Sequence, residues 1–293
     1  CSNGLGGVHI TKDHAIITNC TFLNNTGGPY TGGAIYINLV SIIGDFYNNT
    51  FINNRIDRSD DEETSRYEHG AAIYFDQNAH ENTIKPFTIR NCYFEHNYAH
   101  YCGSAIFANL VDPKEGTEDK FYNIPIIIES CEFVDCFTDD RGGAIGSGSS
   151  NKKEDNVFSN NDIVINNCYF KDCHSKYGGA IYSYDGGETE DEETNITNCI
   201  FDHCSGTNGG CIYSKSYKFV LEHSLFINNA GGRSYLYLKM DEKDVDPIIF
   251  NCTFRNNVIS EMETDIAGTL YVRDCIFEYY TETDLLDGSN MKS

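Results

Sequence analysis

The chain contains no Trp, only five Pro and only three Met among its 293 residues. No apolar run approaches the ~20 residues that a membrane-spanning helix requires, and no basic start followed by an apolar core marks a signal peptide. Basic residues are also scarce, because 21 Lys and Arg stand against 44 Asp and Glu, which gives a net charge of −23. This charge disfavours nucleic acid and anionic lipid as partners. We therefore expect no nucleic-acid binding and no direct membrane insertion by this segment.

One repeated pattern fills the chain, and each copy reads approximately I-x-N-C-x-F-x-x-N followed by G-G-A-I-Y. The Phe of this pattern occurs nine times, with gaps of 23 to 43 residues: Phe22, Phe51, Phe94, Phe133, Phe170, Phe201, Phe226, Phe254 and Phe277. A fixed pattern at such a period predicts a solenoid whose coils pack only on their neighbours. We therefore predict one continuous domain over residues 1–293, with an irregular tail at 280–293.

The first residue falls inside the repeat. Cys1 stands five residues before a pair of glycines, as Cys173 and Cys204 do. This alignment places Cys1 in the middle of a coil. We therefore expect the sequence to be a piece of a longer protein.

The spacing of residues before each Phe predicts the shape of a coil. The fifth position back is usually Ile, and the second position back is Cys in seven of the nine copies. Inward residues at positions −5, −2 and 0 depart once from the period of two expected for a strand, so the chain turns a corner there. The corner residue, at position −3, is mostly Asn: Asn19, Asn48, Asn91, Ser130, Asn167, Asn198, His223, Asn251 and Asp274. Asn tolerates the left-handed backbone conformation that such a corner needs.

Stacked Asn residues at one corner indicate the asparagine ladder of a right-handed parallel β-helix. We predict an all-β, single-stranded β-helix of about nine coils, with coils ~4.8 Å apart. Three strands in each coil would build three parallel sheets. A second turn follows each Phe; its Asn is replaced by Cys136, Cys173 and Cys204 in three consecutive coils.

Variation in length is confined to a few places. One insertion lies between Phe51 and Gly70, and the others follow the glycine strand, at 109–122, 146–162, 184–194 and 239–246. These insertions are polar and mainly acidic, and those that leave the same corner should line up on one side. Insertions on one face of a repeat protein often form its binding face, although tolerated decoration fits the pattern equally well.

The thirteen Cys residues have three interpretations. Stacking in an inward column is the leading one, because free Cys behaves as a small buried apolar residue. Disulfides in the pairs 131/136, 168/173 and 199/204 are the second. Zinc is the weakest, because no C-x-x-C occurs. We expect no metal and no cofactor.

The residue after Ile in the glycine strand forms a column of aromatic residues: Tyr36, Tyr74, Phe107, Tyr182, Tyr213 and Tyr237. If Ile points inward, alternation points this column outward. We expect an exposed stripe that stacks on sugar rings or anchors a partner protein. In the opposite register the column is core. Two N-x-T sequons outside the predicted ladder, at Asn24 and Asn195, are candidate glycosylation sites.

Repeated GGAI at 32–35, 142–145 and 178–181 accompanies F-x-x-N motifs, for instance Phe22–Asn25 and Phe226–Asn229. This combination resembles the polymorphic outer-membrane protein family of bacterial autotransporters. Related repeats occur in large surface proteins of protists and in adhesin-like proteins of archaea. The resemblance covers the whole chain and implies an extracellular or cell-surface location and a role in adhesion. The chain departs from the family pattern because it has no autotransporter barrel.

Catalysis finds little support in the sequence. Glycoside hydrolysis needs two carboxylates at a fixed separation, yet the Ala column of the glycine strand holds only one, Asp265. The run Asp139-Asp140-Arg141 has no evident partner. We therefore predict no catalytic residues, and a β-helix that binds a host, neighbour-cell or matrix protein or glycan. The alternatives are a structural spacer, assembling end to end or side by side with other β-helix segments, and a pectin-lyase-like polysaccharide-active enzyme.

Overall fold

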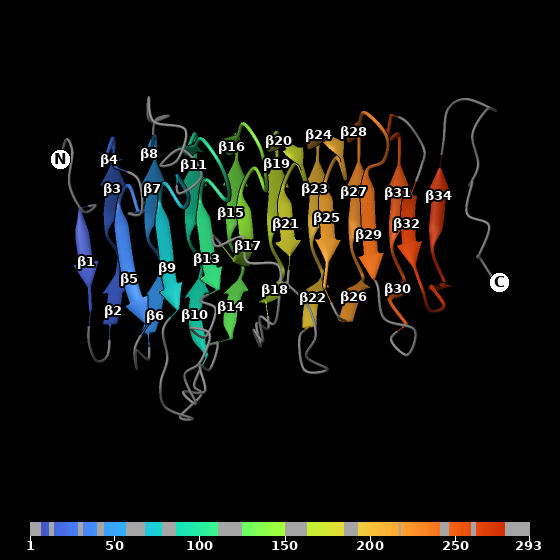
Figure 1. Cartoon of the computed structure of the whole chain (residues 1–293), viewed down its shortest axis with the longest axis horizontal. Coiled ribbons are helices and arrows are strands. Elements are labelled where there is room, and N and C mark those ends of the chain that lie inside the picture. Colours follow the sequence, from blue (N-terminus) through green and yellow to red (C-terminus); the bar gives the residue numbers. More distant parts are fainter. Residues whose placement is uncertain are drawn as a thin grey trace, which may run out of the picture.

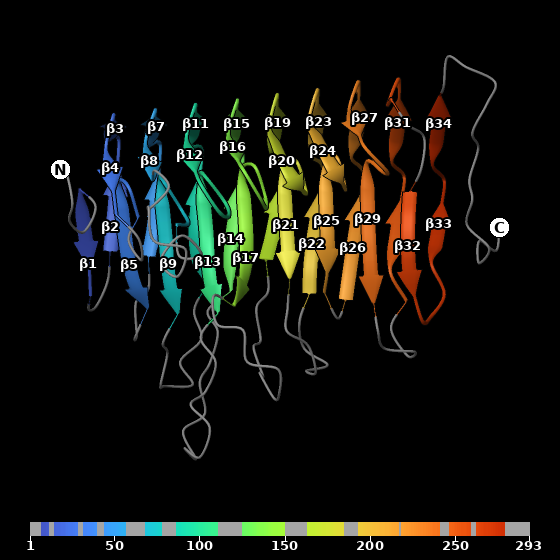
Figure 2. The same ribbon diagram turned by 45° about the horizontal axis from the view of Figure 1, so that its top comes forward.

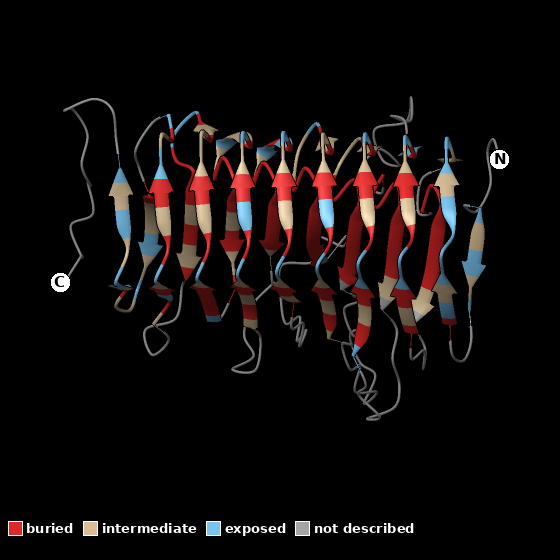
Figure 3. Ribbon diagram, turned by 180° about the vertical axis from the view of Figure 1, so that it is seen from behind, coloured by how far each residue is buried: buried red, intermediate tan, exposed pale blue. Residues whose placement is uncertain are grey.

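The protein is a parallel β-helix. The computed structural model describes residues 7–11, 15–28, 32–39, 44–56, 68–77, 86–110, 125–149, 163–184, 193–216, 218–240, 246–258 and 262–278. Within these ranges every strand pairs in parallel with its equivalents one coil away. Strands such as β5 (Ile35–Leu39) point downwards on the near side of Figure 1, and strands such as β7 (Thr50–Ile52) point upwards on the far side. Because the coils advance from the N-terminus in this view, the helix is right-handed (Figures 1 and 3).

The strands form three nine-stranded sheets and a smaller fourth one (Figure 2). Sheet A contains the strands that begin at the G-G-A-I-Y motif: β1 (Val8–Ile10), β5 (Ile35–Leu39), β9 (Ile73–Gln77), β13 (Ile106–Leu110), β17 (Ile145–Ser149), β21 (Ile181–Tyr184), β25 (Ile212–Lys215), β29 (Leu236–Met240) and β32 (Met262–Ile266). Sheet B follows it in each coil: β2 (Ala15–Thr18), β6 (Gly44–Tyr47), β10 (Phe87–Arg90), β14 (Ile126–Glu129), β18 (Ile163–Asn166), β22 (Glu193–Thr197), β26 (Lys218–Glu222), β30 (Ile248–Phe250) and β33 (Tyr271–Arg273).

Sheet C carries the Phe of the repeat: β3 (Thr21–Leu23), β7 (Thr50–Ile52), β11 (Tyr93–Glu95), β15 (Glu132–Val134), β19 (Tyr169–Lys171), β23 (Ile200–Asp202), β27 (Leu225–Ile227), β31 (Thr253–Arg255) and β34 (Ile276–Glu278). Sheet D has seven short strands: β4 (Thr26–Gly27), β8 (Arg55–Ile56), β12 (Tyr98–Ala99), β16 (Phe137–Thr138), β20 (His174–Tyr177), β24 (Ser205–Asn208) and β28 (Ala230–Gly231). The prediction of three sheets was therefore incomplete.

Two corners of the same kind bound sheet C. The predicted corner at position −3 is confirmed, because all nine residues there have φ between 50° and 55°. The predicted second turn after each Phe is also present, but its left-handed residue lies at position +2 rather than at the Asn or Cys of position +3: Asn24, Asn53, His96, Asp135, Asp172, His203, Asn228 and Asn256. After this second corner the chain extends again for a few residues, which is why sheet D exists.

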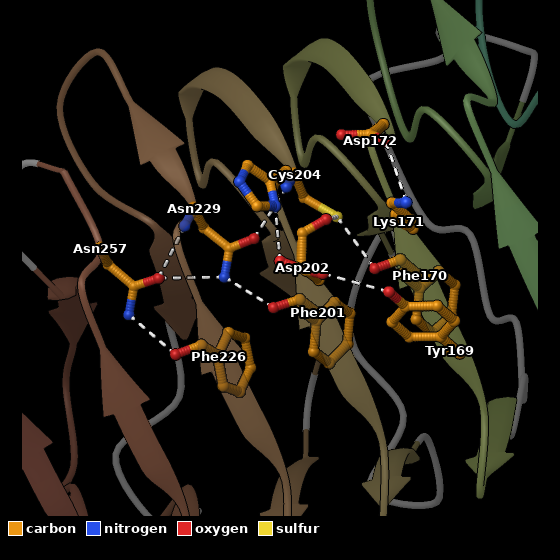
Figure 4. A network of polar contacts seen from close by, with 11 residues as sticks. Tyr169, Phe170, Lys171, Asp172, Phe201, Asp202, Cys204, Phe226, Asn229 and Asn257 are labelled. Atoms are coloured by element: carbon orange, nitrogen blue, oxygen red, sulfur yellow. Dashed lines mark hydrogen bonds and ion pairs between the residues drawn. The ribbon is translucent and has the colours of Figure 1, made fainter.

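The asparagine ladder is present, but its buried part lies after the second corner. Asn97 Oδ1 accepts hydrogen bonds from Asn54 N and Asn54 Nδ2, at 3.1 and 3.0 Å, and Asn97 Nδ2 donates to Phe51 O at 3.0 Å. Asn229 and Asn257 repeat these bonds towards the other end (Figure 4). At the first corner the side chains are mostly exposed, although Asn167 Nδ2 still donates to Ser130 Oγ at 2.9 Å.

Cysteine sulfur replaces the Asn oxygen in both buried columns. Cys92 N lies 3.4 Å from Cys131 Sγ, and Cys20 N donates to Asn49 Oδ1 at 3.0 Å in the same column. All twelve described Cys residues are free thiols. The stacked-core interpretation is therefore confirmed, and the proposed pairs 131/136, 168/173 and 199/204 are not bridged. Burial raises the pKa of Cys136, Cys173 and Cys204, which keeps these thiols protonated.

The interior is filled along its whole described length. The Phe rings of sheet C stack face to face, for example Phe133 on Phe170 with centroids 4.8 Å apart and planes at 5°. Several inward residues of the first and last described coils are only half-buried, among them Phe22 and Phe277. The described residues contain no helix that is long and apolar enough to span a bilayer. The predicted tail at 280–293 and Cys1 lie outside the described residues.

Candidate functional site

The aromatic column of sheet A is not an exposed stripe. Tyr36, Tyr74, Phe107 and Tyr182 are between 2% and 9% exposed, and Tyr213 and Tyr237 are half-buried. Alternation does point the column away from the central core, where the neighbouring Ile side chains lie. Instead, the column belongs to a second, outer cluster that also contains Cys102 and is packed against Tyr101 and Tyr177. The expectation of a solvent-facing aromatic stripe was therefore wrong.

The cover comes from the residues that precede the glycine strand. His69, Cys102, Arg141 and Tyr177 form consecutive parallel bridges between coils. The His69 ring stacks on Phe107 with centroids 4.0 Å apart, and the Arg141 guanidinium lies 5.2 Å from the centroid of Tyr182. These residues fold back over the outer face of sheet A because the glycine that follows each of them allows a tight turn. Gly70, Gly103, Gly142 and Gly178 all have φ near +60°.

Neighbouring rings of the aromatic column stack on one another along the helix axis, so they cover each other's faces. Tyr182, Tyr213 and Tyr237 are nearly parallel, with successive centroids 5.2 and 4.5 Å apart. Tyr36 stacks on Tyr74 in the same way and donates its hydroxyl to Asp76 Oδ2 at 2.6 Å. Burial and this bond raise the pKa of Tyr36 above its ordinary value. The ring faces between neighbouring tyrosines are therefore closed to a sugar ring.

The column is interrupted at Gly146, which occupies the position of Tyr in β17. A Cβ atom at Gly146 would overlap Cys102 Sγ. Arg141 lies beside this gap, 5.0 Å from the centroid of Tyr101, and its Nε is 3.1 Å from Asp140 Oδ2. Burial raises the pKa of the Cys102 thiol. The missing ring thus makes room for a thiol beside a half-buried guanidinium.

A group of titratable residues lies at the same edge, between sheets D and A, and we call it the corner cluster: Glu68, Tyr98, His100 and Asp139. His100 Nδ1 is 2.8 Å from Asp139 Oδ2, and its Nε2 is 4.0 Å from Glu68 Oε2. Tyr98 donates its hydroxyl to Asp139 Oδ2 at 3.0 Å. The Glu68 side chain is fully buried, whereas that of Asp139 is 54% exposed. The imidazole of His100 therefore lies between a buried and an exposed carboxylate.

The sequence pointed to only part of this cluster. The run Asp139-Asp140-Arg141 is visible as a motif, but His100 precedes Asp139 by 39 residues and Glu68 comes from yet another coil. Aligning the coils one repeat apart was the signal that could have joined His100 to Asp139, because Asp139 N donates to His100 O at 3.2 Å. No group of three or more His, Cys, Asp or Glu side chains in the described ranges could hold a metal ion.

The Ala column that a catalytic site would occupy is buried. Ala34, Ala72, Ala105, Ala144 and Ala180 are completely covered, so these positions face the interior rather than a substrate. The two candidate glycosylation sites differ from each other. Asn24 is exposed at the second left-handed corner, and its Oδ1 accepts from Asn53 Nδ2 at 2.6 Å. It is therefore part of a stacked corner, contrary to expectation. Asn195 is half-buried, with Nδ2 3.4 Å from Glu193 Oε1.

The connections of variable length meet at one edge. Five of the nine connections from a sheet A strand to the next sheet B strand are long, and they comprise residues 78–86, 111–125, 150–162, 185–192 and 241–247. The chain also carries an insertion at 57–67, between sheet D and sheet A. The structure thus confirms that the insertions after the glycine strand leave the same corner. Most of their own residues lie outside the described ranges.

The fold and its ladders define the chain as a β-solenoid. No family model matches the sequence, and no solved structure matches it. One curated protein is similar over a short stretch: ubiquitin carboxyl-terminal hydrolase 15 of Bos taurus, 30% identical over 106 residues. That stretch covers 33% of this chain and 11% of the bovine protein. The chain therefore spans about a tenth of that protein, and a match of this extent does not show that the two share a family.

Proposed function

We propose that this β-solenoid is a non-catalytic binding segment of an extracellular or cell-surface protein, as its GGAI and F-x-x-N repeats suggest by resemblance to the polymorphic outer-membrane proteins. Its partner would be a protein or a glycan on a cell or in a matrix. The observation that supports this role is the single edge between sheets A and B, at which five long connections leave sheet A. Surface loops held on a rigid scaffold are the usual place for recognition.

The other described features also support the edge between sheets A and B as the binding site. The aromatic column is covered, and the Asn and Cys columns satisfy one another inside the solenoid. Acidic residues concentrate in the connections, most strongly in Asp185-Gly-Gly-Glu-Thr-Glu-Asp-Glu192, which has five carboxylates and no cation. A partner with a basic surface would be attracted to this edge, and the attraction would weaken with added salt.

The test is binding of the labelled chain to intact cells and to a glycan panel. A matched variant replaces residues 111–124, 150–162 and 185–192 with short Gly-Asn turns, which leaves every described strand intact. Saturable binding that the variant loses supports the proposal. Binding that survives places recognition elsewhere on the solenoid. Absence of binding by both forms favours the alternative role, a structural spacer in a larger surface assembly.

The corner cluster favours one other candidate function, cleavage of a polysaccharide. It joins a histidine, two carboxylates and a tyrosine at one edge, as general acid–base chemistry requires. Release of reducing ends or unsaturated products from a polysaccharide panel, lost in His100→Ala, would support it. No product from the unmodified chain would reject it.

A further inference from the structure

The Cys column beside sheet C ends in an isolated pair of thiols. Cys252 and Cys275 occupy the same position in the last two described coils, because Thr253 and Ile276 are paired directly and Ile276 N donates to Cys252 O at 2.9 Å. In the preceding coil the position belongs to Ser224, which separates the pair from Cys199 and the other thiols of the column. Cys252 is buried, and Cys275 is half-buried in the coil that contains β34, the last described strand (Figure 1).

The two thiols have the same orientation. Cys252 Sγ lies 3.3 Å from Phe250 O, and Cys275 Sγ lies 3.2 Å from Arg273 O, which in each coil is the carbonyl two residues earlier. Each sulfur is also 3.6 to 3.7 Å from a carbonyl of the preceding coil. Equivalent atoms here are separated by the local coil repeat. Two residues further on, Phe254 and Phe277 show that repeat as 4.9 Å between ring centroids.

This separation suits metal binding by the two thiols better than a disulfide bond. A disulfide needs Cβ atoms about 3.5–4.5 Å apart, which is shorter than the repeat, so a bridge would require the last coil to move. A metal–thiolate bond is about 2.3 Å long, and two such bonds in line span about 4.6 Å. Soft thiolate ligands select monovalent copper and similar soft ions, which accept two-coordinate sulfur ligation.

We propose that Cys252 and Cys275 bind one soft monovalent cation, such as Cu(I), in a two-coordinate dithiolate site between the last two coils. Both thiols lose a proton and each sulfur forms one bond to the ion, so two protons leave for every ion bound. The site needs no third side chain. The other stacked pairs, such as Cys131 and Cys168, share the spacing, but both of their thiols are buried, whereas Cys275 is half-buried.

The chain supplies its own control for the test. Ser224 occupies the same column with its Oγ accepting from Cys199 N at 3.1 Å and donating to Glu222 O at 2.8 Å. Serine therefore fits the position, and Cys252→Ser and Cys275→Ser should fold. The exposed Cys20, whose neighbour in the column is Asn49, offers a lone thiol for comparison through Cys20→Ser.

The reduced full chain would be titrated anaerobically with Ag⁺ and with acetonitrile-stabilised Cu(I), in excess imidazole to suppress binding to single thiols. We expect one ion retained in native mass spectrometry, about two protons released, and sulfur-only two-coordinate X-ray absorption. Cys20→Ser should keep the ion, and Cys252→Ser and Cys275→Ser should each weaken binding at least 100-fold. Ser224→Cys should add no second ion, because the new thiol would be as enclosed as Cys131 and Cys168. Absence of retained ion, or equal retention by Cys275→Ser, would overturn the proposal.

Discussion

Aromatic rings stack in two columns of this solenoid, one inside sheet C and one outside sheet A, and the two columns differ in completeness. The inner column has a Phe in all nine coils, with described neighbours 4.6 to 4.9 Å apart. The outer column breaks at Gly146 and is covered by side chains from the adjacent edge. The interior has room for one kind of side chain at this position, so every coil carries the same ring. The outer face can be covered by different side chains in different coils.

Truncation of an inner ring should have the largest effect. Phe133→Ala removes a fully buried ring that stacks on both Phe94 and Phe170, and we expect a loss of about 3–5 kcal/mol in the free energy of unfolding. Tyr182→Ala in the outer column should cost roughly 1.5–3 kcal/mol, because only one layer of side chains covers it. Urea denaturation of both variants measures the difference. Equal losses would show that the two columns are equivalent.

The Asn ladder should be nearly as sensitive as the inner rings. Asn97→Leu removes the acceptor of Asn54 N and the donor to Phe51 O, which leaves buried polar groups without partners. We expect a loss of roughly 2–4 kcal/mol. Asn97→Cys should cost less than half as much, because Cys136, Cys173 and Cys204 already occupy this column. If the Cys variant is as unstable as the Leu variant, sulfur does not substitute for the amide oxygen.

Filling the break in the outer column should destabilise the protein rather than complete the stack. Gly146→Ala places a Cβ where Cys102 Sγ lies, and we expect a loss of about 1–3 kcal/mol. Cys102→Ala should recover part of that loss when the two changes are combined. A double-mutant cycle measures this coupling. Additive effects would mean that Gly146 is needed for another reason.

The sequence was sufficient for the fold because its inward positions repeat strictly. Phe at position 0 and Cys at position −2 mark one side of one strand, and Asn at −3 marks the corner before it. The turn after each Phe was predicted, but its left-handed residue at +2 was not, because the residues there vary among Asn, His and Asp, which share only a tolerance for positive φ. Sheet D follows from that corner and was missed for the same reason.

The candidate site was less predictable, because it depends on contacts between coils. Alternation correctly placed Tyr182 outside the core, but nothing in its own strand shows that Arg141 covers it. His100 and Asp139 meet only when the register between coils is known. Composition does identify the acidic connections, whereas their partner depends on chemistry outside this chain.

A rise to alkaline pH should have the smallest effect on stability of these perturbations. It should act on the outer column alone, because only that column contains side chains that ionise. Burial and then the neighbouring Tyr237 raise the pKa of Tyr213 to about 12, whereas an unfolded tyrosine titrates near 10. The folded protein therefore favours the protonated phenol, and this contribution is complete below about pH 10 and is lost as the pH rises to 12. We expect phenolate absorbance to report this titration and stability to fall across the same window. Tyr213→Phe should flatten that fall, and Tyr47→Phe on the exposed face of sheet B serves as the control. An unchanged profile in Tyr213→Phe would show that the outer column does not limit alkaline stability.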